Sequence, residues 1–423
     1  NGTIFPSLLD DDVYKNIDKC FILNFSKTGQ LKTKKKIHKL NRDKKIKVFF
    51  DKIKNLEKII QKNLFDAAII CLPDDLHYKY LKIILLNKIN VITVKPFVLS
   101  TINALELIEL KKKNDLIGQV DFHKRYDTAN LFIKDKIINN DLGDLLYSTV
   151  EYSQPKDIPL KVFKSWSKNT NIFNYLGVHY ADLIHFLTNF VPISVYATGS
   201  KKFLYSKKIN TYDYIQAIIE WIDPKNKKKF TSTFNLNWID SNNNNAISDQ
   251  RIIFCGTQGK IKSDQTNRGI SFFSKDGLKN PNPYFSEKFN TDGKSIYSGY
   301  GIDTYKKFIF DVLQKKKIGK IKDQNLRATF ESSLSSVAIS EAITKSLESQ
   351  KIETITNIKA NDFIFKSLRA KKNLSKDEII NKKNFEECIY IDRGVSFKST
   401  KGKKLKKKIN KNELLNYSHI FNL

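Results

Sequence analysis

DAAIICLPDDLHYKYLKIILLNKINVITVKPFVLS, residues 66–100, is the stretch that decides the fold. Its two apolar runs, Ala67–Leu72 and Val91–Val94, are nearly continuous, and a helical pattern over Leu76–Leu86 separates them. Apolar runs of this kind are typical of parallel strands that are covered on both faces of a sheet. A strand, a helix and a second strand in this order predict a βαβ unit.

The same alternation extends to both sides of this stretch. Further strands are expected at Cys20–Phe25, Val48–Phe50 and Ile117–Phe122, and further helices at Ile53–Asn63 and Ile102–Asn114. This pattern predicts an α/β Rossmann dinucleotide-binding domain over residues 1–122. The chain opens at Asn1-Gly2-Thr3 without a preceding strand and contains no methionine, so we expect the first strand of this domain to be missing.

From about Leu145 the apolar residues alternate along longer strands. The pattern predicts an α+β domain over residues 123–356 with a large, mostly antiparallel open sheet. The expected strands are Leu145–Tyr152, Ser194–Gly199, Tyr214–Ile222, Phe230–Trp238, Arg251–Gly256 and Ile270–Phe273, and the expected helices are Ile172–Asn189, Tyr305–Gln314 and Gln324–Ser349. A third, Lys-rich and strand-poor segment is expected over residues 357–423.

The composition excludes several classes of protein. A hydrophobic content of 40% over 423 residues is too high for a disordered chain. The formal net charge is +30, but the lysines are scattered and are not interleaved with aromatic residues. A solvated lysine surface is therefore favoured over a nucleic-acid groove, and we expect no nucleic-acid partner. Nucleic-acid binding that weakens strongly with salt remains an alternative.

Membrane and metal partners are not expected either. We find no apolar run of 18 residues, and Asp10, Asp11 and Asp12 interrupt the region where an export signal would lie, which predicts a cytoplasmic protein. The four cysteines, at positions 20, 71, 255 and 388, form no CxxC pair. Buried thiols in a reducing compartment are favoured over metal ligands or disulfides.

One candidate site lies at the ends of the two strands in the opening stretch. The first strand is followed by Leu72 and Pro73, then by an Asp74-Asp75 pair able to cap the next helix and by His77. The second strand runs into Lys95 and Pro96. Ligands of a doubly wound sheet bind outside the carboxyl ends of the strands, so we expect both segments to border a cofactor.

A second candidate site lies in the helix expected at Ile172–Asn189. Tyr175, His179 and Asp182 are spaced i, i+4 and i+7, which places them on one helical face. Histidine is the usual general base near neutral pH, and removal of a hydroxyl proton beside a nicotinamide needs such a group. His185 on the same helix is expected to be structural.

The start of the chain offers candidates for the cofactor's phosphates and ribose. Gly2 lies 22 residues before Asn24, a spacing that fits a phosphate-loop glycine and a ribose-reading position. Asn24 is followed by Ser26 and Lys27, with no carboxylate. An acidic residue would favour a free 2′-hydroxyl, so NAD or NADP is expected with a slight preference for NADP.

With these residues identified, the chain resembles the Gfo/Idh/MocA oxidoreductases, the glucose–fructose oxidoreductase and inositol dehydrogenase family. Residues 66–100 are similar to its Pro-x-x-x-His and Glu-Lys-Pro block, and VDFHKRY at Val120–Tyr126 resembles the motif that ends its nucleotide domain. GVHYAD at Gly177–Asp182 is similar to its GxHxxD helix, and GTQGKI at Gly256–Ile261 resembles its GTxG turn.

The resemblance, through about residue 355, implies hydride transfer between NAD(P) and a sugar or cyclitol carbon. It implies that Lys95 is the catalytic lysine and His179 the acid/base, with Tyr175 beside them. It also implies cofactor contacts from Pro73 and His77 and a place near the domain junction for Arg125, which with Trp166 and Asp182 we expect to bind substrate. Val94 stands where the family has Glu, and Tyr175 where it often has Asp.

The C-terminal segment resembles the two halves of the SAF domain, a small β-clip module best known from sialic acid synthases. KSLRAKKNLSKDEII at Lys366–Ile380 and GKKLKKKINKNELLNYSHI at Gly402–Ile420 carry this likeness. It implies a role in enclosing an anionic sugar. The lysines at positions 371, 372 and 404 are its functional candidates.

These observations predict an NAD(P)-dependent oxidoreductase that acts on a sugar or nucleotide-linked sugar, in surface-polysaccharide or acidic-sugar biosynthesis. The resemblance also implies a homo-oligomer, a dimer or tetramer, formed through the open sheet. The alternative is a protein of the same fold that binds a sugar or dinucleotide without turnover. Cofactor fluorescence with a panel of sugars separates the two, because a binder shows affinity without reaction.

Overall fold

The computed structural model describes residues 2–274, 277–291, 294–321 and 326–355, together with residues 365–370, 373–375, 377–379, 385–390 and 408 of the C-terminal part. The chain divides into two compact units, residues 1–356 and 357–423. Each unit is described by itself. In the described part of the chain, no helix is long and apolar enough to cross a membrane.

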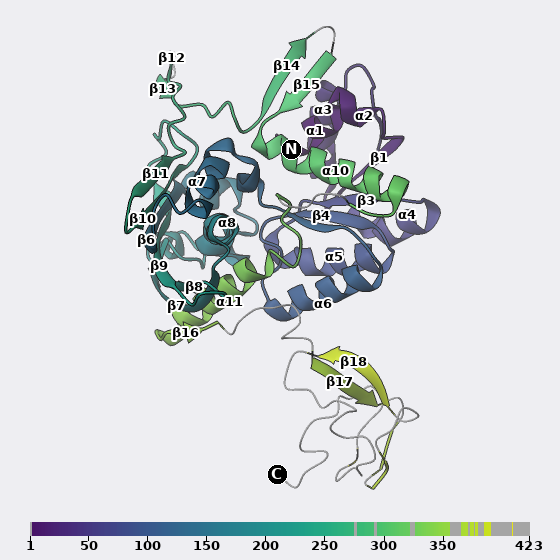
Figure 1. Ribbon diagram of the computed structural model, residues 1–423. Helices are drawn as coiled ribbons and strands as arrows, with labels where there is room; N and C mark the ends of the chain where they lie inside the picture. Colours follow the sequence, from purple (N-terminus) through teal and green to yellow (C-terminus); the bar gives the residue numbers. More distant parts are fainter. Residues whose placement is uncertain are drawn as a thin grey trace. The chain divides into compact units, whose positions relative to one another are not determined.

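The first part of the larger unit contains the predicted alternation of parallel strands and helices (Figure 1). Strands β1 (Lys19–Asn24) and β2 (Lys47–Lys52) pair in parallel, as do β3 (Ala67–Ile70), β4 (Asn90–Val94) and β5 (Gly118–Asp121). The intervening helices are α3 (Lys27–Leu40), α4 (Leu56–Lys62), α5 (His77–Leu86) and α6 (Thr101–Lys113). The two parallel sheets remain separate, and the strand expected before Gly2 stays a prediction.

Two short helices at the start and one late helix pack together beside these strands. They are α1 (Ile4–Leu9), α2 (Asp11–Tyr14) and α10 (Tyr300–Ile318). Phe5 and Leu9 of α1 are buried in one apolar cluster with Ile302 of α10. Asp10, 2% exposed, accepts a hydrogen bond from the backbone of Tyr297 and pairs with Lys306. Helix α10 therefore packs against α1, α2, β4 and β5, and together with α1 to α6 and β1 to β5 it forms the first lobe of the larger unit.

The second lobe contains a seven-stranded mixed sheet in the order β11-β10-β6-β9-β8-β7-β16. Its strands are β6 (Leu145–Pro155), β7 (Val191–Ser200), β8 (Tyr214–Ile222), β9 (Lys229–Asp240), β10 (Asp249–Gly256), β11 (Lys260–Asp264) and β16 (Glu353–Thr354). The prediction of a mostly antiparallel sheet is confirmed, with β6 and β9 as a parallel pair. The strand expected at Ile270–Phe273 is not part of this sheet, because β12 (Phe272–Ser274) pairs with β13 (Gly277–Lys279) as a separate hairpin.

Helices cover one face of the large sheet. These are α7 (Thr128–Ile138), α8 (Val178–Thr188) and α11 (Leu334–Ser349), and α11 packs on both α8 and β7. The short helix α9 (Phe203–Ser206) and the hairpin β14 (Glu287–Thr291) and β15 (Lys294–Ser298) lie in connections. Residues of β8 alternate between buried and outward-facing positions, so the other sheet face is open.

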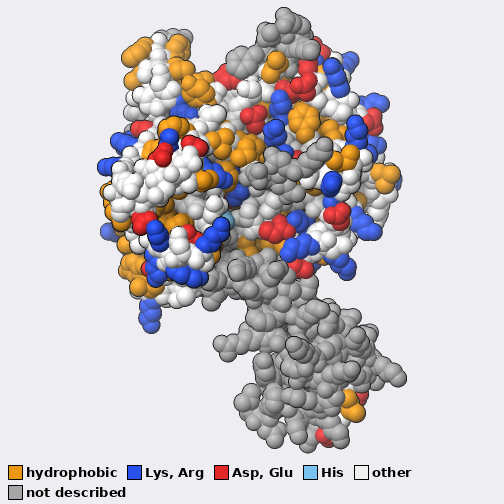
Figure 2. Space-filling model, in the orientation of Figure 1, with side chains coloured by type: hydrophobic (Ala, Val, Ile, Leu, Met, Phe, Trp, Pro, Cys, Tyr) orange, Lys and Arg blue, Asp and Glu red, His pale blue; other side chains and the backbone are white. Residues whose placement is uncertain are grey.

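The positive charge of the chain is spread over the surface. Figure 2 shows lysine and arginine side chains on the described part of this face, interspersed with acidic ones. Many of the lysines are paired, as in the ion pairs Lys82–Glu106, Lys229–Glu220 and Lys316–Asp66. On this face the described lysines are dispersed and partly paired, as in a solvated lysine surface. The absence of a nucleic-acid partner stays a prediction.

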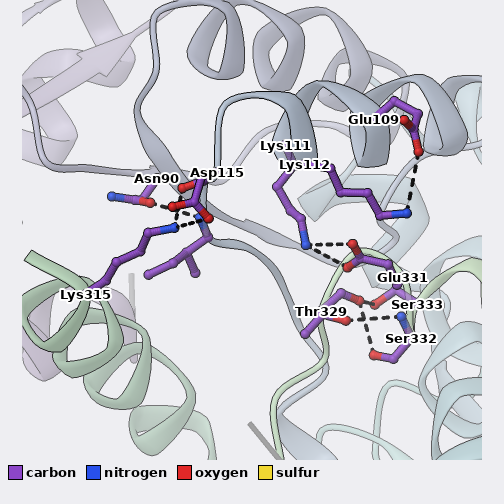
Figure 3. A network of polar contacts seen from close by, with 11 residues as sticks. Asn90, Glu109, Lys111, Lys112, Asp115, Lys315, Thr329, Glu331, Ser332 and Ser333 are labelled. Atoms are coloured by element: carbon purple, nitrogen blue, oxygen red, sulfur yellow. Dashed lines mark hydrogen bonds and ion pairs between the residues drawn. The ribbon is translucent and has the colours of Figure 1, made fainter. Parts of the chain in front are cut away.

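Residues that follow strands β6 to β11 in the sequence, in α10 and near Glu331, contact α6 and the segment before β5 (Figure 3). Lys111 of α6 pairs with Glu331 at 2.7 Å, and Lys315 of α10 pairs with Asp115 at 2.9 Å. The backbone around Phe330 adds to β5, because Phe330 N donates to Gly118 O at 3.1 Å. The Phe330 ring, fully buried, stacks on Phe97 at 4.1 Å between centroids. Phe330 thus attaches the segment before α11 to β5 and to Phe97, which follows β4.

The smaller unit contains an antiparallel pair, β17 (Phe365–Ala370) and β18 (Phe385–Tyr390). The expectation of a strand-poor segment stays a prediction. The candidate lysines at positions 371, 372 and 404 lie outside the described residues. The SAF-like identity of this unit stays a prediction.

The expectation of buried cysteines needs correction. Cys71 is exposed, because β3 ends at Ile70 and the chain leaves the sheet before the thiol. Cys20 and Cys255 are half-buried, and burial raises the pKa of the Cys20 thiol to about 11. The side chain of the cysteine at position 388 is outside the described residues.

The contact between Gly118 and Phe330 yields a test of this packing. A Cβ added at Gly118 would lie 2.7 Å from the Phe330 ring. Because that ring is packed on Phe97, we expect Gly118→Val to lower the free energy of unfolding by about 2 kcal/mol, measured by urea denaturation. Phe330→Leu makes room, so the double variant should lose less than the sum of the two single changes. Additive losses would contradict the proposed clash.

Candidate active site

Lys95 lies directly after β4, at the carboxyl edge of the parallel strands. Its Nζ donates a hydrogen bond to the backbone carbonyl of Tyr175 and lies 3.5 Å from the centroid of the Tyr175 ring. An ammonium over an aromatic face is attracted by the electron-rich ring. The contact brings the strand end of the first lobe to the helix start of the second, as the sequence predicts for Lys95 and Tyr175.

Burial changes the titration of Lys95. Removal from water lowers its pKa to about 8, against the opposing charges of Asp74 and Asp121. An amine with this pKa carries a charge at neutral pH and can still release a proton at modest cost. Such a group suits the stabilisation of negative charge on a substrate oxygen.

Asp74 takes a different role from the expected helix cap. Its carboxylate accepts a hydrogen bond from the Thr170 hydroxyl at 2.6 Å, and no side-chain cap is formed at this helix start. Burial raises the pKa of Asp74, although Lys95 opposes the shift. Asp75 accepts a hydrogen bond from Asn169 at 3.0 Å instead. The two acids therefore attach this loop to the second lobe.

His77 is fully buried and ties together the ends of β3 and β4. Its Nδ1 lies 2.7 Å from Pro96 O and its Nε2 lies 2.9 Å from Leu72 O. With both nitrogens occupied by backbone carbonyls, His77 acts as a brace. Leu72, Pro73 and Pro96 form the edge that His77 holds in place, and the predicted cofactor contacts at this edge, that of His77 included, stay predictions.

His179 comes from α8, whose approach to the sheet depends on Gly177. A Cβ at Gly177 would lie 2.8 Å from Leu236 of β9 and 2.5 Å from the Phe173 ring. Residues Phe173–Gly177 form a π-helical turn before α8 begins at Val178. Tyr175 lies within this π-helical turn and contacts Lys95 through its ring and carbonyl.

The His179 imidazole is buried at 4% exposure in a cationic environment. Burial lowers its pKa well below the usual value, and the charges of Lys95, His123 and Lys124 lower it further. Its Nδ1 has no hydrogen-bond partner among the described residues. His179 is therefore a neutral imidazole near neutral pH, the form that accepts a proton.

Arg125 and Asp182, both expected to bind substrate, bind each other. Arg125 Nε and Nη2 donate to the two Asp182 carboxylate oxygens at 2.8 and 2.5 Å. The two side chains are 3% and 1% exposed. This buried bidentate pair fixes α8 to the segment after β5. The predicted substrate contacts of Arg125 and Asp182 stay predictions.

Lys124 is a second buried lysine, which the sequence analysis did not select. It donates hydrogen bonds to the side-chain oxygens of Gln250, at 2.6 Å, and of Gln265, and its Nζ lies 4.8 Å from the Tyr180 ring centroid. Burial lowers the pKa of Lys124 to about 7, despite the carboxylate of Asp127. Its position in VDFHKRY gave no signal of burial, because both glutamine partners lie more than a hundred residues away in the sequence.

Trp166 lies near this site, in an aromatic cluster. Its ring is 4.6 Å from the Phe163 ring and 5.9 Å from the Tyr175 ring, between centroids. Trp166 is half-buried, so part of its surface remains available. Its predicted contact with substrate stays a prediction.

The expected dinucleotide residues lie around β1. Asn24 ends this strand, its amide donates to the Thr33 hydroxyl at 3.3 Å, and its buried Oδ1 has no partner among the described residues. Ser26 caps α3 by accepting from Gly29 N at 3.0 Å, and Lys27, exposed, begins that helix. Gly2 precedes α1 and has open space at its Cα. An unpaired acceptor at a strand end suits a ribose hydroxyl, so these residues fit a dinucleotide.

No metal site accompanies this arrangement in the described residues. Among them, no cluster of three or more His, Cys, Asp or Glu side chains could hold a metal ion.

Comparison with protein families agrees with this architecture. The model of an oxidoreductase family's NAD-binding Rossmann fold matches residues 32–122, and the model of the same family's C-terminal alpha/beta domain matches residues 134–355. The chain belongs to the Gfo/Idh/MocA oxidoreductase family. The matches end before the C-terminal unit, and none identifies an SAF-like domain in it.

Two curated oxidoreductases match parts of the chain. Oxidoreductase P35 of Formosa agariphila is 26% identical over 206 residues, which cover 47% of this chain and 61% of that protein. Oxidoreductase YteT of Bacillus subtilis is 26% identical over 139 residues, 32% of each chain. The chain thus spans less than two thirds of the length of either relative.

Solved structures share the Gfo/Idh/MocA fold at low identity. Myo-inositol 2-dehydrogenase from Lactobacillus plantarum is 16% identical with a TM-score of 0.61, covering 80% of this chain and all of that one. Scyllo-inositol dehydrogenase from Lactobacillus casei, with bound NAD(H) and scyllo-inositol, is 14% identical with a TM-score of 0.58, covering 80% and 99%. GenD2 from gentamicin A biosynthesis, in complex with NAD, is 13% identical with a TM-score of 0.62, covering 84% and 93%.

The Arg125–Asp182 pair provides a test of how α8 is held. Asp182→Asn leaves a buried guanidinium without its opposite charge, so we expect a loss of about 3 kcal/mol in the free energy of unfolding. Urea denaturation measures this loss. The matched control is Lys161→Ala, which breaks the exposed Lys161–Asp157 pair and should cost less than about 1 kcal/mol. Equal, small losses in both variants would contradict the structural role of the pair.

Proposed function

We propose that this chain is an NAD-dependent dehydrogenase that oxidises a secondary hydroxyl of a polyol or sugar, or reduces the corresponding ketone. The observation that carries the proposal is the convergence of Lys95 and His179 from separate lobes at the carboxyl edge of the parallel strands. The site combines a buried cation with a neutral base, the two groups that alcohol oxidation needs.

The residues would act on a hydroxyl placed between them. Lys95, in its charged form, orients the substrate oxygen and stabilises the negative charge that develops on it. His179, in its neutral form, accepts the hydroxyl proton as the carbonyl forms. The bound nicotinamide supplies the acceptor for the hydride that leaves the carbon. Tyr175 holds the Lys95 ammonium through its carbonyl and ring.

NAD is proposed over NADP, against the slight preference drawn from Asn24, Ser26 and Lys27. The matching family model is described as NAD-binding, and two of the solved relatives are described with NAD or NAD(H). Asn24 presents an unpaired carbonyl oxygen, which suits a ribose hydroxyl better than a phosphate.

The substrate class follows from the relatives and from the charge of the site. The solved relatives include inositol dehydrogenases, which supports a polyol or sugar ring. The cationic environment of Lys95 and Lys124 favours a substrate that also carries negative charge, such as an acidic or nucleotide-linked sugar used for surface polysaccharide.

A homo-oligomer through the open face of the large sheet is part of the proposal. Tyr147, Tyr196 and Ile218 are large side chains on that face and are 43%, 39% and 49% exposed. Tyr196 and Ile218 are directly paired in the register of β7 and β8, so they form one apolar surface.

A binding protein without turnover is the second candidate. Val94 and Tyr175 stand where the family resemblance leads one to expect acids, and they motivate this alternative. The Lys95 and His179 variants described next decide between the two candidates, because a binder shows no turnover to lose.

Removal of either group tests the mechanism. We expect Lys95→Met and His179→Gln each to lower kcat/KM at least about 100-fold with a polyol substrate. Turnover is measured from the absorbance of NADH with a panel of inositols and hexoses. Lys79→Met is the matched control, an exposed lysine on α5, and should keep full activity. NADH fluorescence shows whether the variants still bind cofactor. Full turnover in either site variant would contradict the mechanism.

The pH dependence of turnover tests the charge state of Lys95. Lys95 has a lowered pKa of about 8, so its charge is present below that pH and is lost above it. We therefore expect kcat/KM for oxidation to fall as pH rises through about 8. Lys95→Arg remains charged over this range, so its residual activity should lack this basic limb. If the basic limb of kcat/KM is unchanged in Lys95→Arg, a group other than Lys95 causes it and the prediction is wrong.

A further inference from the structure

A second histidine lies against the proposed base. His123 and His179 have ring centroids 4.8 Å apart at an interplanar angle of 54°. His123 opens a short 3₁₀ turn (His123–Tyr126) directly after β5, so it reaches the site from the first lobe. The mechanism above uses His179 alone and leaves this contact without a role.

A buried carboxylate holds His123. Asp121, 8% exposed, has Oδ1 3.3 Å from His123 Nδ1, and its Oδ2 accepts a hydrogen bond from the Tyr305 hydroxyl at 2.7 Å. Asp121 is also the register partner of Val94, the residue before Lys95, and its charge raises the Lys95 pKa. The Asp121 carboxylate is therefore close to His123 and acts on the charge of Lys95.

The groups facing the two imidazoles come from several elements. His179 is faced by Lys95 from the end of β4, by Lys124 from the same turn as His123, and by the ring of Tyr152 in β6. His123 is faced by Asp121, and by the rings of Phe285 and Tyr300, at 5.3 and 5.7 Å between centroids. In this set the carboxylate contacts His123, whereas cations surround His179.

Packing alone does not explain a histidine at position 123. The Tyr300 ring stacks on it at an interplanar angle of 25°, a contact that a phenyl ring would make equally well. Asp121 Oδ1 is buried, has no hydrogen-bond partner among the described residues and lies 3.3 Å from His123 Nδ1, so a phenyl ring would remove its nearest polar neighbour on that side. His123 thus contacts a carboxylate and a second imidazole, polar neighbours with which a phenyl ring would make no charge or hydrogen-bond interaction.

We propose that His123, which lies against both Asp121 and His179, is a positioning residue of the acid–base site: its ring orients His179 and helps to keep it in the neutral, proton-accepting form. Burial and Lys95 both oppose protonation of His179, and His123 adds to them from the contact between the two rings. The role in turnover rests on the proposed function, whereas the coupling of the two rings does not.

Proton NMR of the full chain without cofactor tests the coupling directly. The imidazole Cε1–H signal of His179, identified by its loss in His179→Gln, is followed against pH in the wild type, His123→Asn and His123→Phe. We expect the His179 midpoint to rise by about 0.5 to 1 pH unit in both variants. His123→Phe retains a ring against Phe285 and Tyr300, so the packing is preserved. The exposed His38, replaced by Asn, is the matched control and should leave the midpoint unchanged.

The activity profile gives the second readout. His179 must be neutral to accept a proton, so the acidic limb of kcat/KM for oxidation should move to higher pH in His123→Asn and His123→Phe, with the plateau above it retained to within about threefold. In Asp121→Asn, the loss of a charge that raises the Lys95 pKa should move the basic limb to lower pH.

The outcomes separate the inference from the proposed function. An unchanged His179 midpoint in both His123 variants overturns the inference, even where Lys95 and His179 prove essential for turnover. A raised midpoint in a chain that shows no turnover supports the coupling and overturns the dehydrogenase proposal instead. A plateau that collapses with no shift of either limb shows His123 to be merely structural and also overturns the inference.

Discussion

The structure of the site depends on one contact, that of the Lys95 ammonium with the carbonyl and ring of Tyr175. It joins a strand end to a helix start that lies 80 residues later in the chain. For the ammonium to reach Tyr175, β4 must end at Val94 and the chain must enter α8 through a π-helical turn. Because the contact buries the lysine, it also lowers the pKa of Lys95 and, through its charge, that of His179.

The buried Lys95 ammonium requires opposite charges nearby, and they come from the ends of the two strands that flank β4. Asp74 follows β3 and Asp121 ends β5, so both carboxylates lie at the same sheet edge as Lys95. The family pattern has an acid directly before the lysine, at the position of Val94 here, and its cross-strand neighbour Asp121 provides a carboxylate in its place. The Arg125–Asp182 pair is separate from this balance, because the two charges neutralise each other within α8 and its neighbour.

Much of the fold and part of the site could be predicted from local patterns. The apolar runs of β3 and β4, and the position of Lys95 directly after the second run, depend on neighbouring residues and were visible in the sequence. The partners of Arg125 and Lys124 were not, because Asp182, Gln250 and Gln265 lie 57 to 141 residues away. The π-helical turn before Val178 could not be predicted, because it leaves no signal in the periodicity. The hairpin at β12 was assigned to the large sheet because alternation along a strand does not specify its partner.

The distribution of charge around His179 explains how two groups with lowered pKa values can work together. Carboxylates approach Lys95, whereas the nearest partners of Lys124 are neutral glutamine oxygens, so the base side of the site carries an excess of positive charge. Together with burial, that excess makes protonation of His179 unfavourable. It becomes favourable once an anionic oxygen lies between His179 and Lys95, because the new negative charge offsets the cations. A site of this kind resists protonation by solvent and accepts a proton from a substrate whose oxygen is left negative, which is the differential stabilisation that alcohol oxidation requires.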